Sequence, residues 1–208
     1  MPVTYLIIGI TVIISVLAFS NKEMFYKLEL SPYQVTNRKE WYRTFTHGFI
    51  HVDFIHLLIN MYVLYMFGTL VENFFGQLFG MKSKLYYLLL YLGGMNFAAL
   101  PSLKKHKNNP YYRAVGASGA VSAVLFSAIL FIPTAPLRIM FIPIDIPAFI
   151  FGILYLALEY YLNKKANDNI AHDAHYWGAL FGIVFTLIIS PSTGLMFLQK
   201  VGVFLGIG

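Results

Sequence analysis

The chain has 208 residues, of which 58% are hydrophobic and only 12% are charged, and its net charge is +6. This composition excludes an ordinary soluble domain and indicates an all-α polytopic membrane protein. The absence of cysteine excludes disulfides and cysteine-ligated metal centres. The basic residues are scattered through the connections between apolar segments, which is typical of contact with lipid headgroups, so we expect the bilayer and no nucleic acid as a partner.

Six apolar segments approach the length of about 20 residues that a bilayer-spanning helix needs. They are Thr4–Ser20, Phe54–Phe75, Lys84–Leu100, Ala114–Ile132, Ile146–Leu162 and Ala174–Ser190. The first lacks the basic start and the cleavage site of a signal peptide, so we interpret it as a span. We expect one domain over residues 1–190. The apolar tail, residues 191–208, is expected to form an interfacial helix or a partial span.

The connection between the first two spans, Asn21 to Asp53, is long and mixes charged residues with aromatic ones such as Trp41 and Tyr42. Aromatic side chains favour the membrane–water interface. We therefore expect this loop to lie partly in the membrane.

The second span contains two polar residues, His56 and Asn60, near its start. Residues four apart lie on one face of a helix, so the two side chains could offer hydrogen bonds to a single point. Alternatively, each simply bonds a neighbouring helix, as polar residues in membrane bundles often do.

In the fourth span, Ser118 stands between Gly116 and Gly119. Small residues let another helix backbone approach closely, which explains the glycines without any chemistry. A lone serine in such a segment usually packs or bonds its own helix.

The sixth span carries His175, Gly178 and Gly182 on one helical face. If this glycine stripe packs on the small residues of the fourth span, His175 lies near Ser118, because both residues are close to the start of parallel helices. A serine beside a histidine, with hydrogen-bond donors at equal depth on the second span, has the parts of an acyl-transfer site.

Three motifs resemble the signatures of rhomboid intramembrane serine proteases, specifically of the minimal six-span bacterial form. They are HLLIN (56–60), GASG (116–119) and AHYWGALFG (174–182). The resemblance implies a six-transmembrane-helix rhomboid-like bundle with a long, partly membrane-embedded first loop. It also implies a serine endopeptidase that cleaves transmembrane segments of other membrane proteins, at small residues.

Residue roles follow from the same resemblance. Ser118 would be the nucleophile and His175 the general base, in a dyad without an acidic third member. The oxyanion would be held by the Ser118 backbone N–H with the side chains of His56 and Asn60. The close-packing residues would be Gly116, Gly119, Gly178 and Gly182.

The sequence departs from the family pattern at Ser122, where many rhomboids carry an aromatic residue that packs on the catalytic imidazole. What orients His175 is therefore an open question. For hydrolysis, water must reach the site, and we expect it to enter at a polar mouth formed by His47, His51, Asp53 and a loop from His172 to His175.

The family pattern implies a bacterial inner membrane with the active site opening to the extracytoplasmic side. The Lys and Arg count predicts the opposite orientation. Eleven lie in the connections on the side where the second, fourth and sixth spans begin, and four lie on the other side.

Three alternative functions are open to these residues. A metalloprotease would use His47 with His51 or His172 with His175, but no H-E-x-x-H is present and Asp173 would point away from His175. A non-catalytic rhomboid-like module for membrane binding or quality control would not need both Ser118 and His175. A transporter would line a path with its polar groups rather than gather them at one depth. We expect no cofactor and no metal.

Overall fold

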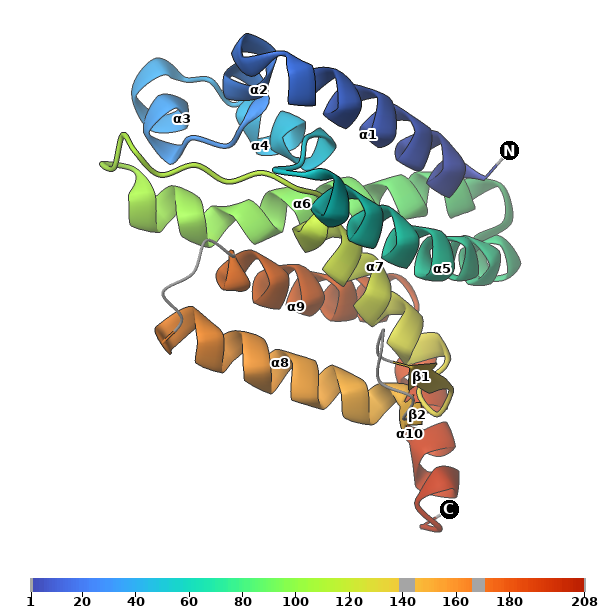
Figure 1. The fold of residues 1–208 in the computed structure, drawn as a ribbon. Coiled ribbons are helices and arrows are strands. Elements are labelled where there is room, and N and C mark those ends of the chain that lie inside the picture. The colour runs from blue at the N-terminus through green and yellow to red at the C-terminus, as the bar shows by residue number, and fades with distance from the viewer. Residues whose placement is uncertain (1, 139–144, 166–170, 208) are drawn as a thin grey trace.

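The computed structural model describes residues 2–138, 145–165 and 171–207 and forms a bundle of helices (Figure 1). Each predicted span overlaps one long helix, which confirms the all-α class. These helices are α1 (Val3–Ser20), α5 (Phe54–Phe79), α6 (Ser83–His106), α7 (Ser118–Phe131), α8 (Ala148–Lys165) and α9 (His172–Ile189). The one sheet among the described residues is a two-stranded antiparallel hairpin of β1 (Pro136–Arg138) and β2 (Asp145–Pro147), between α7 and α8.

The fourth span begins later than its apolar pattern predicts, at Ser118 rather than at Ala114. Ala114 instead exchanges backbone hydrogen bonds of 2.9 and 3.1 Å with Leu30, in the first loop. This bridge holds the chain extended up to the start of α7, because a residue paired in a bridge cannot adopt helical geometry.

Helix α7 forms the centre of the bundle. Every residue from Gly119 to Phe131 is buried, and α7 contacts α5, α6, α8, α9 and α10 (Pro191–Phe204). A helix that is apolar on all sides is stable only when other helices surround it. The outer helices instead expose large apolar side chains, for example Ile13, Ile55 and Ile153, as expected of surfaces that face lipid.

Two stretches among the described residues are long and apolar enough to cross a membrane by themselves. They are Val3–Ser20 and Phe54–His106, which contains α5 and α6 joined through η2 (Gly80–Lys82). Helices α9 and α10 pass the same test together but are bent by 110° at Ser190. Because α10 contacts α9 and α7, the apolar tail is a helix packed on the bundle. Its placement in the interface or across the membrane stays a prediction.

The long first loop folds into short helices with recognisable start signals. They are α2 (Lys22–Leu28), α3 (Pro32–Arg38), α4 (Arg43–Thr46) and η1 (His47–Phe49). The Asn21 side chain caps α2, and the Ser31 side chain caps α3, which has proline in its first turn. The loop is therefore ordered structure rather than a flexible connection.

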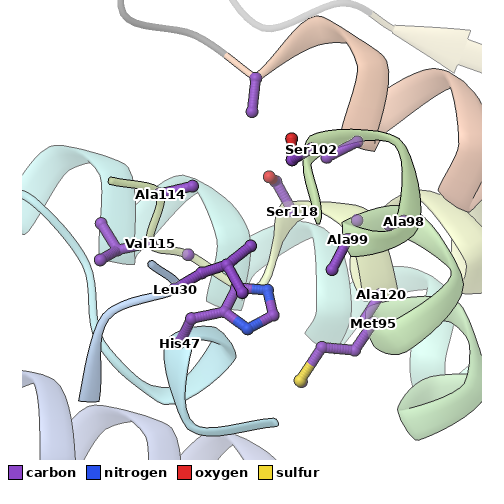
Figure 2. A pocket seen from close by; sticks show the side chains of 14 residues that line it. Leu30, His47, Met95, Ala98, Ala99, Ser102, Ala114, Val115, Ser118 and Ala120 are labelled. Atoms are coloured by element: carbon purple, nitrogen blue, oxygen red, sulfur yellow. The ribbon is translucent and has the colours of Figure 1, made fainter. Parts of the chain in front are cut away.

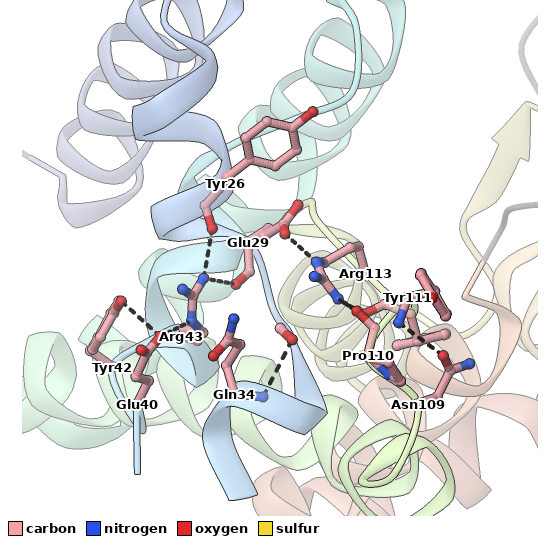
Figure 3. Close-up of polar contacts among 12 residues, drawn as sticks. Tyr26, Glu29, Gln34, Glu40, Tyr42, Arg43, Asn109, Pro110, Tyr111 and Arg113 are labelled. Atoms are coloured by element: carbon pink, nitrogen blue, oxygen red, sulfur yellow. Dashed lines mark hydrogen bonds and ion pairs between the residues drawn. The ribbon is translucent and has the colours of Figure 1, made fainter. Parts of the chain in front are cut away.

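Arg43 ties the first loop together (Figure 3). Its guanidinium donates to the carbonyl oxygens of Tyr26 and Glu29 at 2.8 and 2.9 Å and pairs with Glu40 at 2.6 Å. The Glu29 carboxylate in turn pairs with Arg113, in the segment that leads into α7. The Arg43 bonds have several partners and are largely buried, so they fix the loop itself. The pair of Glu29 with Arg113 connects the loop to the segment that leads to the candidate nucleophile.

Two histidines that we predicted at a polar mouth are buried instead. His51 is 0% exposed, and its ring bonds Ser15 through Nδ1 at 2.9 Å and accepts from the backbone N–H of Ala117 through Nε2 at 3.3 Å. His47 is 8% exposed and bonds the Arg43 carbonyl oxygen through Nδ1 at 2.9 Å. Burial lowers the pKa of His51 to about 3 and that of His47 to about 4. Both rings are therefore structural and neutral at pH 7.

We expect Gly182→Ala to destabilise the bundle. A Cβ atom at Gly182 would lie 2.1 Å from the Ala123 carbonyl oxygen, and overpacking of this kind costs about 1–3 kcal/mol. The melting temperature in detergent should fall by several degrees. The matched control is Gly76→Ala in α5, where an added Cβ meets nothing within 4 Å. Equal melting temperatures for the two variants would contradict the close contact.

We also expect stability to fall between pH 7 and pH 5. Above the unfolded-state pKa of 6.5 both histidines are neutral in both states, whereas below it the unfolded chain takes up protons that the folded chain rejects until its lower pKa is reached. In this pH range each histidine lowers the free energy of unfolding by up to about 1.4 kcal/mol per pH unit. Melting curves of the wild type and of His51→Gln at several pH values test this: the variant should lose less stability on acidification, and parallel curves would refute the assignment.

Candidate active site

The turn before α7 fixes the position of Ser118. The backbone N–H of Gly116 donates to the His47 carbonyl oxygen at 2.9 Å, and that of Ala117 donates to His51 Nε2. Gly116 has a φ of +114°, which strains any residue with a side chain, and a Cβ there would lie 2.6 Å from His56 Cε1. Glycine is therefore required at position 116, and it places the His56 ring directly beside the turn.

Ser118 is the first residue of α7, and this helix start has no side-chain cap. The N–H groups in the first turn of a helix have no partner within the helix. They carry partial positive charge and can bind an anion. The Ser118 backbone N–H belongs to this first turn.

Helices α7 and α9 touch backbone to backbone, as the small-residue stripes predict. A Cβ at Gly178 would lie 2.1 Å from the Gly119 carbonyl oxygen, and one at Gly119 would lie 2.5 Å from the Ala98 Cβ of α6. The same added Cβ at Gly119 would lie 3.5 Å from the carbonyl oxygen of Ala174, the residue before His175. Gly119 and Gly178 thus lie where α7 and α9 are in contact, close to the starts of the two helices.

Ser118 and His175 make no hydrogen bond with each other within the described parts of the chain. The His175 ring is 18% exposed, and its Nδ1 lies 3.1 Å from Glu159 Oε1 on α8. Catalytic hydrogen bonds are often long in structures without substrate and shorten when it binds.

A cavity adjoins Ser118 (Figure 2). It offers about 30 Å³ to water-sized molecules, which is room for roughly two waters. Its wall is made largely of small residues: Ala98, Ala99, Ala114, Gly116, Gly119, Ala120, Ala171 and Ala174. The hydroxyls of Ser118 and Ser102 and the His47 ring add polar groups to this wall. A water for hydrolysis therefore has a place beside the candidate nucleophile.

The two predicted oxyanion donors on α5 are close to this turn but differ in their bonding. His56 Nδ1 is buried and has no hydrogen-bond partner among the described residues, and the ring stacks edge-on against His51 with centroids 5.0 Å apart. Asn60 donates from Nδ2 to the His56 carbonyl oxygen of its own helix at 2.9 Å. Asn60 thus bonds its own helix rather than a neighbouring one, while His56 lies against the turn that leads to Ser118. Asp53 caps α5 by accepting from the His56 N–H.

Residues 172 and 175 lie on the first turn of α9, not in a loop as we predicted. Both bond the same carboxylate: Glu159 Oε2 is 2.6 Å from His172 Nδ1, and Glu159 Oε1 is 3.1 Å from His175 Nδ1. Asp173 bonds Ser102 instead, at 3.2 Å. Sequence analysis missed Glu159; the available signal was an acidic residue inside an apolar span, which is costly unless it has a function or a partner.

Glu159, His172 and His175 are also the residues best placed to hold a metal ion. Their ligand atoms lie within 4.8 Å of one another, and imidazole and carboxylate ligands suit zinc. The same atoms already satisfy one another by hydrogen bonds. The cluster is thus explained without an ion.

Ser122, the departure from the family pattern, bonds helix α8. Its hydroxyl lies 2.9 Å from the hydroxyl of Tyr155, one helical turn before Glu159. Ser122 is 4% exposed. The space beside position 122 is therefore shared with an aromatic side chain that comes from another helix.

The chain is similar in sequence to several rhomboid-like proteins. The chain is 33% identical over 145 residues to RHOMBOID-like protein 12, mitochondrial, of Arabidopsis thaliana, and 32% identical over 144 residues to the human presenilin-associated rhomboid-like protein, mitochondrial. These alignments cover 64% and 65% of the chain but 42% and 34% of the relatives. Rhomboid-like protein 11, chloroplastic, of Arabidopsis thaliana is 28% identical over 168 residues, with coverage of 77% of the chain and 56% of the relative.

The rhomboid domain family matches residues 38–192, which include α4 through α9 and every candidate site residue. The match spans well over half of the sequence. The chain belongs to the rhomboid family.

Proposed function

We propose that the chain is an intramembrane serine endopeptidase that cleaves transmembrane segments with Ser118 as nucleophile and His175 as general base. The observation that carries this proposal is the backbone contact of α7 and α9, which sets the uncapped start of α7, with Ser118, beside the His175-bearing turn and a water-sized cavity. Family membership adds to it.

In the proposed reaction, Ser118 Oγ attacks the peptide carbonyl carbon while His175 takes the hydroxyl proton. The carbonyl electron pair moves to oxygen, where the Ser118 N–H and His56 would stabilise the negative charge. His175 then returns the proton to the leaving amine, and a water molecule hydrolyses the acyl-enzyme by the same steps. The proposed substrates are membrane proteins with small residues at the cut, in a helix that unwinds, because an intact helix hides its carbonyls.

The rival function is a non-catalytic rhomboid-like module that binds membrane proteins. The specific observation in its favour is that Ser118 and His175 form no hydrogen bond in the part of the chain that the structure describes. An activity measurement separates the two readings, because a binding module would retain substrate affinity without any cleavage.

We expect purified protein in detergent to cleave a single-span substrate, and Ser118→Ala or His175→Ala to abolish cleavage. His56→Ala should lower kcat by about 10²–10³ because an oxyanion donor is lost. Ser127→Ala is the matched control, since Ser127 lies on the same helix but bonds Thr186, away from the cavity. Undiminished cleavage by Ser118→Ala would exclude the serine mechanism.

The membrane orientation is a second proposal. We propose that the site faces the extracytoplasmic side of a bacterial inner membrane, although the relatives carry mitochondrial and chloroplastic names. The chain has no cysteine, so single cysteines report topology cleanly. Tyr111 is 90% exposed in the connection before α7, and Met81 is 101% exposed on the connection between α5 and α6.

In intact bacterial cells, a membrane-impermeant maleimide should label Tyr111→Cys and leave Met81→Cys unlabelled until the cells are opened. The reverse pattern would place the site in the cytoplasm, in agreement with the Lys and Arg count.

A further inference from the structure

Helix α8 carries one acidic side chain into the bundle, and that side chain meets the candidate catalytic base. Glu159 is 7% exposed, and its two carboxylate oxygens bond His172 and His175 separately. A buried carboxylate in a membrane helix is costly unless it is paired and hydrogen-bonded. Its burial is therefore explained by these two imidazoles.

The bond to Glu159 decides which nitrogen of His175 carries the proton. An ionised carboxylate only accepts hydrogen bonds, so the Nδ1 that faces it must donate. In a neutral imidazole the other nitrogen then has a free lone pair. Nε2 is thereby prepared to accept a proton, as a general base requires.

We propose that Glu159 is a positioning residue for His175, which makes the site a triad of Ser118, His175 and Glu159 in place of the dyad that the family pattern implies. This inference rests on the proposed function. The carboxylate fixes the tautomer and the ring of His175 and stabilises the imidazolium that forms when Nε2 takes the Ser118 proton. Glu159 keeps its charge throughout: the Nδ1 proton stays on the ring, and the Nε2 proton goes to the leaving amine.

A second contact keeps α8 in register with the site. Tyr155, one turn before Glu159, bonds Ser122 of α7. The ring of His175 has no aromatic support from position 122, and the bond that fixes it comes from α8. The open question of what orients His175 thus has an answer on a different helix.

His172 offers a structural alternative that can be tested. It bonds the other oxygen of the same carboxylate, so Glu159 could serve only to hold the first turn of α9. In that case, removing the His172 ring would harm the enzyme as much as removing the Glu159 charge. If Glu159 acts through His175, removing the Glu159 charge should lower kcat much more than removing the His172 ring.

The experiment measures kcat and KM for a single-span substrate in detergent. Glu159→Gln should lower kcat by about 10²–10⁴ with KM within about threefold, because a neutral amide permits the wrong tautomer. Glu159→Asp keeps the charge but places it one methylene farther from His175. Its kcat should be intermediate, roughly 10- to 100-fold below that of the wild type. His172→Gln should keep kcat within about threefold of wild type, because the bond from His175 Nδ1 to Glu159 remains.

The outcomes distinguish the triad from a structural role of Glu159 and from a failure of the proposed function. Wild-type kcat in Glu159→Gln, with Ser118→Ala inactive, would overturn the triad and leave the protease standing. Equal losses in Glu159→Gln and His172→Gln would overturn it in favour of a structural role. Wild-type protein no more active than Ser118→Ala would instead refute the proposed function itself. If melting curves show that Glu159→Gln is unfolded, Glu159→Asp decides: a reduced kcat at unchanged KM supports the triad, and wild-type kcat contradicts it.

Discussion

The backbone of α9 lies against the backbone of α7, and the candidate site depends on this contact. Gly178 and Gly182 leave no room for a Cβ beside the carbonyl oxygens of Gly119 and Ala123. In a bilayer no hydrophobic force drives helices together, so close packing of small residues is a principal source of association. The same two glycines therefore contribute stability and bring the start of α9, with His175, close to the start of α7, with Ser118. A larger residue at either position would force the two helices apart.

The first loop supports the other side of the site. Arg43 ties α4 to the carbonyl oxygens of Tyr26 and Glu29, and Glu29 pairs with Arg113. His47 and His51 then bond the backbone N–H groups of the turn before Ser118, one through its carbonyl oxygen and one through its ring. Burial keeps both rings neutral, and a neutral ring nitrogen is what can accept from Ala117. The first loop thus holds the turn before Ser118 in place through these hydrogen bonds.

Much of this arrangement could be predicted from sequence, because it rests on local patterns. Apolar length gives the six long helices, and helical spacing places His56 with Asn60 and His175 with Gly178. Predictions failed where a partner lies far away along the chain. The bridge from Leu30 to Ala114 delays the start of α7, and the bonds from His51 to Ser15 and Ala117 bury a ring that looked like part of a polar mouth. The histidines that bond Glu159 lie on another helix, so in the sequence only the presence of an acidic residue in an apolar span signalled a role.

Helix α8 then explains why a serine can stand at position 122. A large ring on α7 would compete for space with Tyr155, which bonds Ser122 from across the helix interface. Position 122 holds no aromatic ring that could pack on His175, and the carboxylate that bonds His175 Nδ1 lies one turn beyond Tyr155 on the same helix. In the proposed triad, this carboxylate takes over the restraint of the imidazole. A hydrogen bond fixes both the angle of the ring and its tautomer, whereas an aromatic contact fixes only the plane.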